Sequence, residues 1–347
     1  MSAVISAPGS SVVVRRRSTR VRALWLVAAI VVLVGLACLS VAVGSRAVTW
    51  EEIGLGVTGH VDTIGQAAVY KRVPRTILAI VVGAALAVSG AVMQGVTRNP
   101  LADPGILGVT MGASLAVVTG IAWFGLFSVQ GYIWTAIVGA GVTAVAVYAV
   151  GSLGRGGATP LKLALAGAAT SAALTSLISA VVLPRGDIVE IVQSWQVGGV
   201  GGATYEPLAT VAPFLVVGFV MSWGCSRWLN SMALGDEVAA GLGVKVAGAR
   251  ACAALGAVIL AGAATAVAGP IAFVGLVVPH VCRLLVGVDH RWLIPFSAVV
   301  GACLVTTADV VGRLIAQPAE IQVGIVTAIV GAPVFIAIVR RTKVREL

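Results

Sequence analysis

The chain has 347 residues, of which 59% are hydrophobic and only 10% are charged, and its mean hydropathy is +1.05. An ordinary soluble domain carries about 25% charged residues, so this composition excludes a soluble globular enzyme and predicts a polytopic helical membrane protein. The formal net charge is +10, but the basic residues are spread between apolar segments and do not form the cluster that nucleic-acid binding requires.

Membrane spans are predicted from runs without Asp, Glu, Lys or Arg, because a crossing helix needs about 20 apolar residues. These runs are 23–44, 76–97, 104–154, 163–184, 207–226, 251–279, 292–308 and 321–339. The third run is long enough for two crossings joined near Gly125 to Gly131, which gives nine. The stretch 271–286 contains Pro279 and two polar residues, and it is an ambiguous tenth.

Both ends of the chain are basic. Five arginines precede the first run and four basic residues follow the last. Because cytoplasmic flanks carry the Lys/Arg excess, both termini are expected in the cytoplasm, and the number of crossings is then even. We therefore predict ten crossings, with 17 of the 23 basic residues on the cytoplasmic side. The predicted organisation is a basic tail over 1–22, a transmembrane domain over 23–340 and a second tail over 341–347.

Catalytic machinery is not apparent. The histidines His60, His280 and His290 lack the spacing of a metal-binding helix pair, and no lysine follows glycine as in a phosphate-binding loop. Gly112-Ala113-Ser114 only partly matches the turn of an intramembrane serine protease, because Leu115 stands where a second glycine is needed. We expect no catalytic residue, bound cofactor or metal in this chain.

Arg72 and Arg75 stand at the predicted outer start of the second span, three residues apart and so on one helix face. Arg313, at the outer end of the ninth span, is a third such charge. We predict an outward cationic surface that meets acidic residues of a soluble partner. The alternative is that these arginines only snorkel to the membrane interface.

A hairpin break is predicted over 94–108, where two prolines prevent helix continuation and where Asn and Asp can cap the broken ends. Irregular backbone at membrane depth must be buried in protein or line water. The break is expected to be structural, although helix and hairpin residues around 88–116 and the fifth span are predicted to line a translocation path. The residues assigned to the hairpin and path are Gln94, Asn99, Pro100, Asp103, Pro104 and Gly108.

A polar but Ala/Leu-rich segment over 229–244 predicts two short helices with glycine breaks on the cytoplasmic side. Its small side chains allow close approach, so we favour a docking surface over a plain connecting loop. The residues assigned to this surface are Asn230, Ala233, Leu234, Gly235, Asp236, Glu237, Ala239, Gly241, Leu242 and Gly243.

A second break is predicted over 268–283. Gly269 and Pro270 interrupt the apolar run, and Pro279 removes a helical hydrogen bond, which puts His280 and Arg283 near the inner end of a short span. A lone histidine at such a place is more often a packing residue than a proton carrier.

A proton-coupled secondary transporter is the main alternative of a different class, and it needs an intramembrane ionisable carrier. Asp309 and His280 are the only candidates, and Asp309 can instead pair locally with Arg313 one helical turn on.

Several motifs occur in an order that closely resembles the FecCD-type permeases of bacterial ABC importers for iron chelates, haem and cobalamin. The resemblance runs from about residue 43 to 341. The motifs are Arg-x-Pro-Arg at 72–75, Gly-Ala-Val-Met-Gln at 90–94, Asn-Pro-Leu-Ala-Asp-Pro at 99–104, Leu-Gly-Asp at 234–236, Gly-Pro-Ile-x-Phe-Val-Gly at 269–275, Pro-His-x-x-Arg at 279–283, Asp-His-Arg at 289–291, Val-Gly-Ile-Val-Thr at 323–327 and Gly-Ala-Pro at 331–333.

The resemblance implies a type II (BtuC-like) ABC importer permease with ten transmembrane helices. It also implies a second permease subunit, identical or paralogous, two cytoplasmic ATPase subunits that bind ATP and Mg, and an outer substrate-binding protein. Arg72, Arg75 and Arg313 would pair with glutamates of that protein, and 230–246 would form the coupling helices. Import would follow alternating access at the bacterial inner membrane, with a ferric siderophore favoured as cargo over haem or cobalamin and no nucleic-acid partner.

Overall fold

The computed structural model describes residues 18–105, 107–126, 128–153 and 160–341, and these residues form only α-helices and the loops between them. The helices are α1 (Thr19–Ala42), α2 (Trp50–Val57), α3 (Ile64–Thr97), α4 (Val109–Phe124), α5 (Val129–Ser152), α6 (Pro160–Val182), α7 (Val189–Gln196), α8 (Tyr205–Gly224), α9 (Ser226–Met232), α10 (Asp236–Gly241), α11 (Val246–Ala268), α12 (Val274–Val286), α13 (His290–Ile315) and α14 (Val323–Arg341). The all-helical class is confirmed. The first helix begins at Thr19, inside the predicted tail, whereas residues 1–17 and 342–347 of the two tails lie outside the described residues.

Among the described helices, α1, α3, α5, α6, α8, α11 and α13 are long and apolar enough to cross a membrane. The shorter apolar helices α4, α12 and α14 add three candidates. α12 has 13 residues and is therefore only about 20 Å long, less than the ~30 Å hydrocarbon thickness of a bilayer. The loop over 269–273 extends this segment, and its Ile271 is buried, as irregular backbone at such depth requires.

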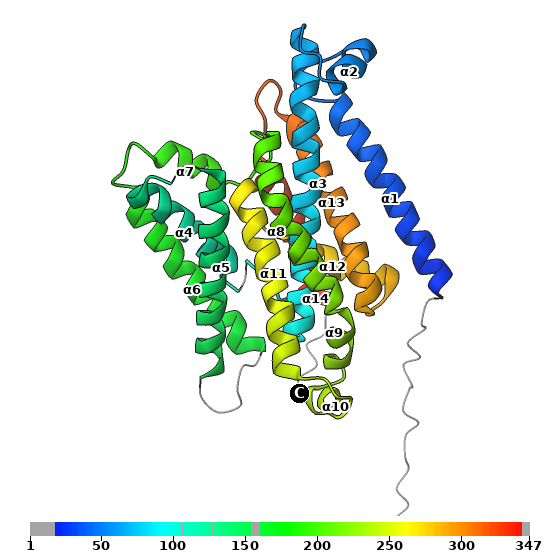
Figure 1. Cartoon of the computed structure of the whole chain (residues 1–347), viewed down its shortest axis with the longest axis vertical. Helices are drawn as coiled ribbons and strands as arrows, with labels where there is room; N and C mark the ends of the chain where they lie inside the picture. Colours follow the sequence, from blue (N-terminus) through cyan, green and yellow to red (C-terminus); the bar gives the residue numbers. More distant parts are fainter. Residues whose placement is uncertain (1–17, 106, 127, 154–159, 342–347) are drawn as a thin grey trace, which may run out of the picture.

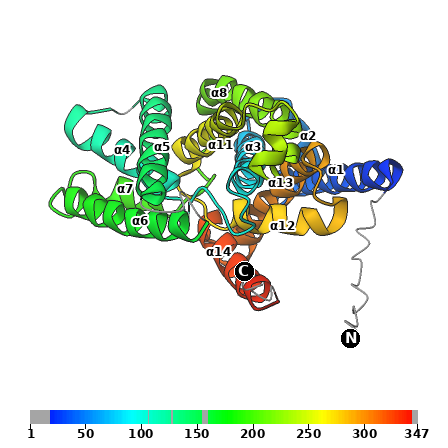
Figure 2. The same cartoon turned by 90° about the horizontal axis from the view of Figure 1, so that it is seen from below.

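α3 is the centre of the bundle. It packs against α1, α2, α8, α11, α12 and α13, and 78% of its most apolar stretch is buried, against 6% for α1. Figure 2 shows α3 enclosed by α8, α11, α12 and α13, with α1 at one edge and α4 to α7 grouped at the other. α3 and α13 are in close contact at Gly83, where a Cβ would overlap the carbonyl of Gly301. Such small-residue contacts let membrane helices pack backbone to backbone.

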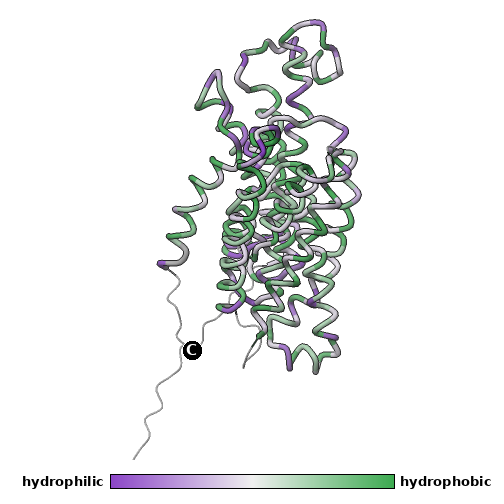
Figure 3. Tube along the Cα trace, turned by 90° about the vertical axis from the view of Figure 1, so that its left-hand side faces the viewer, coloured by the Kyte–Doolittle hydropathy of each residue, from purple (hydrophilic) through white to green (hydrophobic). Residues whose placement is uncertain are grey.

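The molecule has two opposite ends, with α2 at one and α10 at the other (Figure 1). The α2 end comprises residues 40–75, 309–320 and the α7 region, and the α10 end comprises the start of α1, residues 226–250 and 286–291. Apolar residues dominate the middle of the bundle, and hydrophilic stretches gather toward the ends (Figure 3). This distribution is the one that a membrane-spanning bundle requires.

Capping boxes define the helix starts at the α2 end. The hydroxyl of Thr49 accepts from the backbone N–H of Glu52, whose carboxylate accepts from the N–H of Thr49 at 2.9 Å. Thr63 and Gln66 repeat the pattern at the start of α3. The hydrogen bond from the backbone of Thr49 lowers the pKa of Glu52 below its ordinary value.

The first predicted break is present between α3 and α4, over residues 98–108. Asn99 Oδ1 accepts from the backbone N–H of Leu101 at 3.0 Å, and Asp103 Oδ1 accepts from that of Gly105 at 2.7 Å. Each side chain therefore stabilises a turn of its own, as Asn and Asp do where a helix cannot continue. The break lies within the protein, since Asp103 is buried.

Candidate functional site

Two arginines at the α2 end cap the last turn of α1. Arg72 donates to the carbonyl oxygen of Ala42 at 2.9 Å, and Arg313 donates to the carbonyl oxygens of Ser40 and Val43, both at 2.9 Å. The last carbonyls of a helix have no helical donor, and they carry partial negative charge. Arg72 and Arg313 therefore fasten the end of α1 to α3 and α13.

Asp309 forms the buried centre of the same cluster. Its carboxylate is fully buried and lies 2.7 Å from the guanidinium of Arg75 and 2.8 Å from that of Arg313. Arg75 also pairs with Glu320 at 2.6 Å. A buried carboxylate needs such compensation by opposite charge. The local pairing predicted between Asp309 and Arg313 is confirmed, and it leaves Asp309 no role as an unpaired carrier of protons.

The three arginines come together at one end as predicted, but they do not form an open cationic surface. Arg72 and Arg313 are 7% and 1% exposed, and the side chain of Arg75 is 12% exposed. The physical reason is that the end of α1 and two carboxylates supply acceptors for all three guanidinium groups within the chain. A soluble protein that docks on these arginines would therefore have to replace an acceptor that the chain itself now supplies.

A second polar cluster lies at the α10 end and joins α9 to the start of α13. Asn230 donates to Asp289 Oδ1 at 2.7 Å, and its own Oδ1 accepts from the backbone N–H of His290 at 2.9 Å. Arg22 of α1 lies 3.6 Å from Asp289. Burial raises the pKa of Asp289, but the hydrogen bonds from Asn230 and the backbone of Arg291 lower it more, so the net pKa is below its ordinary value. We call Asn230, Asp289 and His290 the Asn230 clamp.

Asp236, the first residue of α10, is anchored by Arg98 at 3.2 Å and by Arg250 at 3.0 Å. Arg98 ends α3 and Arg250 lies in the first turns of α11, so the anchor fixes α10 to two spanning helices. The predicted pair of short helices is thus confirmed as α9 and α10, held on both sides by charged or amide groups.

The α9–α10 segment, residues 226–243, carries exposed apolar side chains outside the bundle. Leu234, Val238 and Leu242 are 63%, 50% and 62% exposed, and successive members are four residues apart. A cluster of exposed apolar residues in a polar loop region is typical of a protein-binding surface. Two assigned docking residues are unsuitable for direct contact, because Ala239 is buried and Asn230 is engaged in the clamp.

The prediction that the helix breaks at Pro279 is wrong, because α12 runs without interruption from Val274 to Val286. Proline lacks the N–H that would donate to the carbonyl of Gly275 four residues earlier. That carbonyl instead accepts from the side chain of Gln94, at 3.1 Å, and Gln94 in turn accepts from Arg283. A side chain of α3 thus replaces the lost helical hydrogen bond. Gln94 itself lies within α3 and not in the hairpin.

The second break is shorter than predicted and is centred on residues 269–273. Gly269 has φ +68°, and a Cβ there would overlap the carbonyl of Trp195. The N–H of Gly199 donates to the carbonyl of Ala268 at 2.8 Å, which ties the α7–α8 loop to the end of α11. Pro270 follows in the loop. His280 makes no hydrogen bond within the described part of the chain.

A small hollow lies between α4, α6 and α7, with a volume of about 190 Å³. It is lined by Met111, Ser114, Thr175, Ile178, Ser179, Gln196 and Pro270. The sequence ranges predicted to line a path, 88–116 and the fifth span, therefore meet at this hollow. Among the residues that the structure describes, no three His, Cys, Asp or Glu side chains are placed to hold a metal ion.

Sequence reasoning missed the Asn230 clamp and the capping of α1. Asn230 and Asp289 each stood in a recognised motif, but 59 residues separate them and nothing in either motif indicates the other. The capped groups of α1 are backbone carbonyls, which every residue has, so no residue type could have identified them.

Comparison with known proteins places the chain in context. The family model described as the FecCD transport family matches residues 17–341. The chain is 41% identical, over 91% of its length and 95% of the relative's, to the Bacillus subtilis protein named "Probable siderophore transport system permease protein YfiZ". It is 44% identical to the ferric enterobactin permease FepD of Escherichia coli, over 78% of this chain and 80% of that one. A solved structure titled "An inward-facing conformation of a putative metal-chelate type ABC transporter" matches with TM-score 0.78 at 30% identity, covering 92% of this chain and 99% of that one.

Proposed function

The chain belongs to the FecCD transport family, as the permease of an ABC importer for iron chelates, and we propose that its cargo is a ferric siderophore. The permease is not itself an enzyme. The two relatives described above, which are named for siderophore or ferric enterobactin transport, support this cargo over haem or cobalamin. Hydrolysis of ATP on partner subunits drives the transport, and this chain supplies the path.

The proposed topology has ten crossings, made by the seven long helices together with α4, α12 and α14. The α10 end faces the cytoplasm of a bacterium, and the α2 end faces outward. The charge pattern supports this orientation, because the exposed basic residues Arg20, Arg227, Lys245 and Arg291 lie at the α10 end. Both termini are then cytoplasmic.

The α9–α10 segment is the proposed docking site of the ATPase subunits, and its exposed apolar side chains are the observation that carries the proposal. Leu234, Val238 and Leu242 are exposed apolar side chains of the kind that form the centre of a protein interface. The segment is also rigidly connected, because Asp236 and Asn230 tie it to α3, α11 and α13. A displacement of the docked ATPases would therefore move the spanning helices directly.

The α2 end is the proposed docking face of the substrate-binding protein. Arg75 is the best placed of the three arginines, because its partner Glu320 is 35% exposed and lies at the edge of the cluster. A glutamate of the incoming protein could take the place of Glu320 on Arg75. Arg72 and Arg313 then act by holding the end of α1 beneath the docked protein.

The proposed translocation path runs along α6, next to a second permease subunit. Thr175, Ser176 and Ser179 of α6 are exposed, although α6 is long and apolar enough to span the membrane. Thr175 and Ser176 donate to carbonyls one turn earlier in α6. Residues with hydroxyl groups are enriched where membrane helices contact one another, so we assign this face to the path or to the partner permease. None of the described residues that line the hollow beside α6 is ionisable, which fits a path that holds its cargo weakly and releases it.

The experiment that tests this function is ATP hydrolysis by the purified importer. The permease is isolated with its ATPase and binding-protein subunits, and hydrolysis is measured with ferric siderophores, haem and cobalamin in turn. The expected result is stimulation by a ferric siderophore. Stimulation by haem or cobalamin alone would show that this compound, and not a ferric siderophore, is the cargo. If no ATPase copurified with the permease, the proposed docking site would be contradicted.

A further inference from the structure

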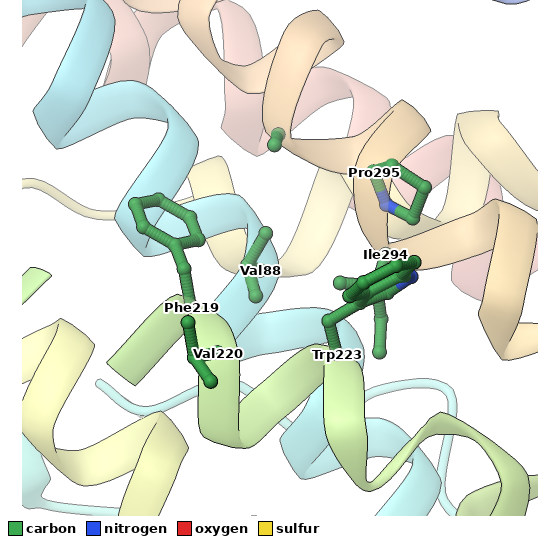
Figure 4. A pocket seen from close by; sticks show the side chains of 7 residues that line it. Val88, Phe219, Val220, Trp223, Ile294 and Pro295 are labelled. Carbon is green, nitrogen blue, oxygen red and sulfur yellow. The ribbon is translucent and has the colours of Figure 1, made fainter. Parts of the chain in front are cut away.

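An apolar groove lies on the side of the bundle between α3, α8 and α13, with a volume of about 280 Å³ (Figure 4). It is lined by Val88, Phe219, Val220, Trp223, Ile294, Pro295 and Ala298. Val220 and Trp223 are 65% and 61% exposed, so the groove opens away from the protein. Its walls belong to helices that are long and apolar enough to cross a membrane, so an occupant of the groove is expected to be apolar.

Two arginines lie close in sequence to residues that line this groove, on the α10 side. Arg227 follows Trp223 by four residues across the turn at Cys225 that separates α8 from α9, so its place is given by its neighbours in α9. Arg291 precedes Ile294 by three residues in α13. Residues three or four apart share a helix face and are separated by about 5 Å along the axis.

Both arginines are available for an anion. Arg227 and Arg291 are exposed, and neither has a carboxylate within 4 Å among the described residues. Asp289 is the nearest acidic residue in sequence, but it is already engaged by Asn230 and lies close to Arg22. The positive end of the α13 dipole adds to the attraction for negative charge.

The Asn230 clamp brings the two arginines to one place. Asn230 bonds to the residues that begin α13, and Arg227 stands three residues before Asn230, on the same face of α9. Arg227 therefore lies on the side of α9 that faces the start of α13, where Arg291 is found. A phospholipid has an acyl chain, then an interfacial region, then a phosphate headgroup. The apolar groove, the tryptophan and the two arginines follow the same order.

We propose that this site binds an anionic membrane phospholipid, with an acyl chain in the groove and the phosphate on Arg227 and Arg291. The lipid contacts α8 and α9 on one side and α13 on the other. It therefore joins the helix that leads into the α9–α10 segment to the helix that ends in the arginine cluster of the α2 end.

The test is native mass spectrometry of the detergent-purified importer with phosphatidylglycerol or phosphatidylcholine of equal chain length. The expected result is tighter binding of phosphatidylglycerol. Changing Arg227→Gln together with Arg291→Gln is expected to weaken it about twenty-five-fold, since each arginine near a lipid surface contributes about fivefold. Arg227→Lys with Arg291→Lys keeps the charges and should keep the preference. Arg20→Gln, an exposed arginine of α1 at the same end, is the matched control and should have no effect.

A second arm tests the groove. Ala298→Leu fills it and should weaken the binding of both lipids, whereas Val216→Leu, on an exposed part of α8 outside the groove, should not. Glycerol phosphate, which lacks acyl chains, should not compete. Equal binding of the two lipids, an unchanged preference in the double glutamine variant, or full competition by glycerol phosphate would each overturn the proposal.

Discussion

Gln94 of α3 donates its side-chain amide to the carbonyl oxygen of Gly275 in α12, the acceptor that Pro279 leaves without a helical donor. The two helices touch at this level, since a Cβ on Gly90 would overlap the same carbonyl. A proline in a short buried helix and a glutamine 185 positions earlier in the chain thus form one structural unit.

This unit predicts that Gln94→Leu lowers the stability of the purified permease by about 1–3 kcal/mol, because the Gly275 carbonyl and Arg283 lose a buried partner. In a Pro279→Ala background the helix regains its N–H, so the cost of Gln94→Leu should fall. Thermal unfolding of the four proteins measures the difference. Gln193→Leu, at an exposed position of α7, is the control. Equal costs in both backgrounds would show that the two residues are independent.

Glu320→Gln is predicted to strengthen binding of the substrate-binding protein by up to about fivefold, because it removes the carboxylate that now competes for Arg75. Arg75→Gln should weaken the same binding. Surface plasmon resonance on the detergent-purified importer measures both. Arg72→Glu is a poor probe here, since Arg72 caps α1 and its loss affects folding. If neither variant alters affinity, Arg75 serves only within the permease.

Leu234→Ala combined with Leu242→Ala is predicted to weaken the association of the ATPase subunits about tenfold or more, as expected when two exposed apolar anchors are truncated. The measurement is the amount of ATPase that copurifies with the tagged permease across a dilution series. Leu255→Ala, an exposed leucine of the spanning helix α11, is the matched control. Undiminished copurification would place the ATPase elsewhere.

The Asn230 clamp predicts a pH dependence. The pKa of Asp289 is lowered in the folded protein, so its contribution to stability is present above its ordinary pKa of 3.8 and is lost as the pH falls through the lower folded value. Asn230→Ala removes a hydrogen bond that lowers the pKa of Asp289. The contribution of Asp289 to stability should then be lost at a higher pH than in the wild type. Thermal unfolding against pH, compared with Asp289→Asn, checks this. The acid dependence of the wild type and Asn230→Ala would coincide if the clamp had no effect on Asp289.

Cys225 lies at the junction of α8 and α9, and Cys252 lies in α11. Their sulfur atoms are 3.5 Å apart. We expect diamide to oxidise the two thiols to a disulfide, while the N=N bond of diamide takes up their two electrons and two protons and becomes the hydrazine. Two of the five cysteines would then resist alkylation until reduced. Cys252→Ser should leave no such pair. Five reactive cysteines after oxidation and denaturation would contradict the packing of α9 against α11.

The sequence was sufficient for the fold class and for the presence of non-helical segments after α3 and after α11. Prolines with Asn and Asp at 99–104 require a non-helical segment, and Gly269 followed by proline requires another, because these residues act through local backbone geometry. The paired short helices around residue 236 were predictable for the same reason.

Contacts between distant segments were not predictable from the sequence. Arg72 and Arg313 are satisfied by carbonyls at the end of α1, so arginines that are expected to be exposed are buried. Pro279 leaves its helix intact because Gln94 supplies the missing donor. In each case the deciding partner is a backbone carbonyl or an amide from another helix, and local patterns do not encode it.

The orientation of the α10 end is the central claim, and labelling with a membrane-impermeant maleimide tests it most directly. Single cysteines are introduced at Val238→Cys in α10 and Val61→Cys beyond α2, both exposed positions, in a variant without native cysteines. In intact spheroplasts we predict labelling at position 61 at once and at position 238 only after the membrane is permeabilised. Labelling at position 238 from outside would invert the molecule and remove the proposed ATPase docking site.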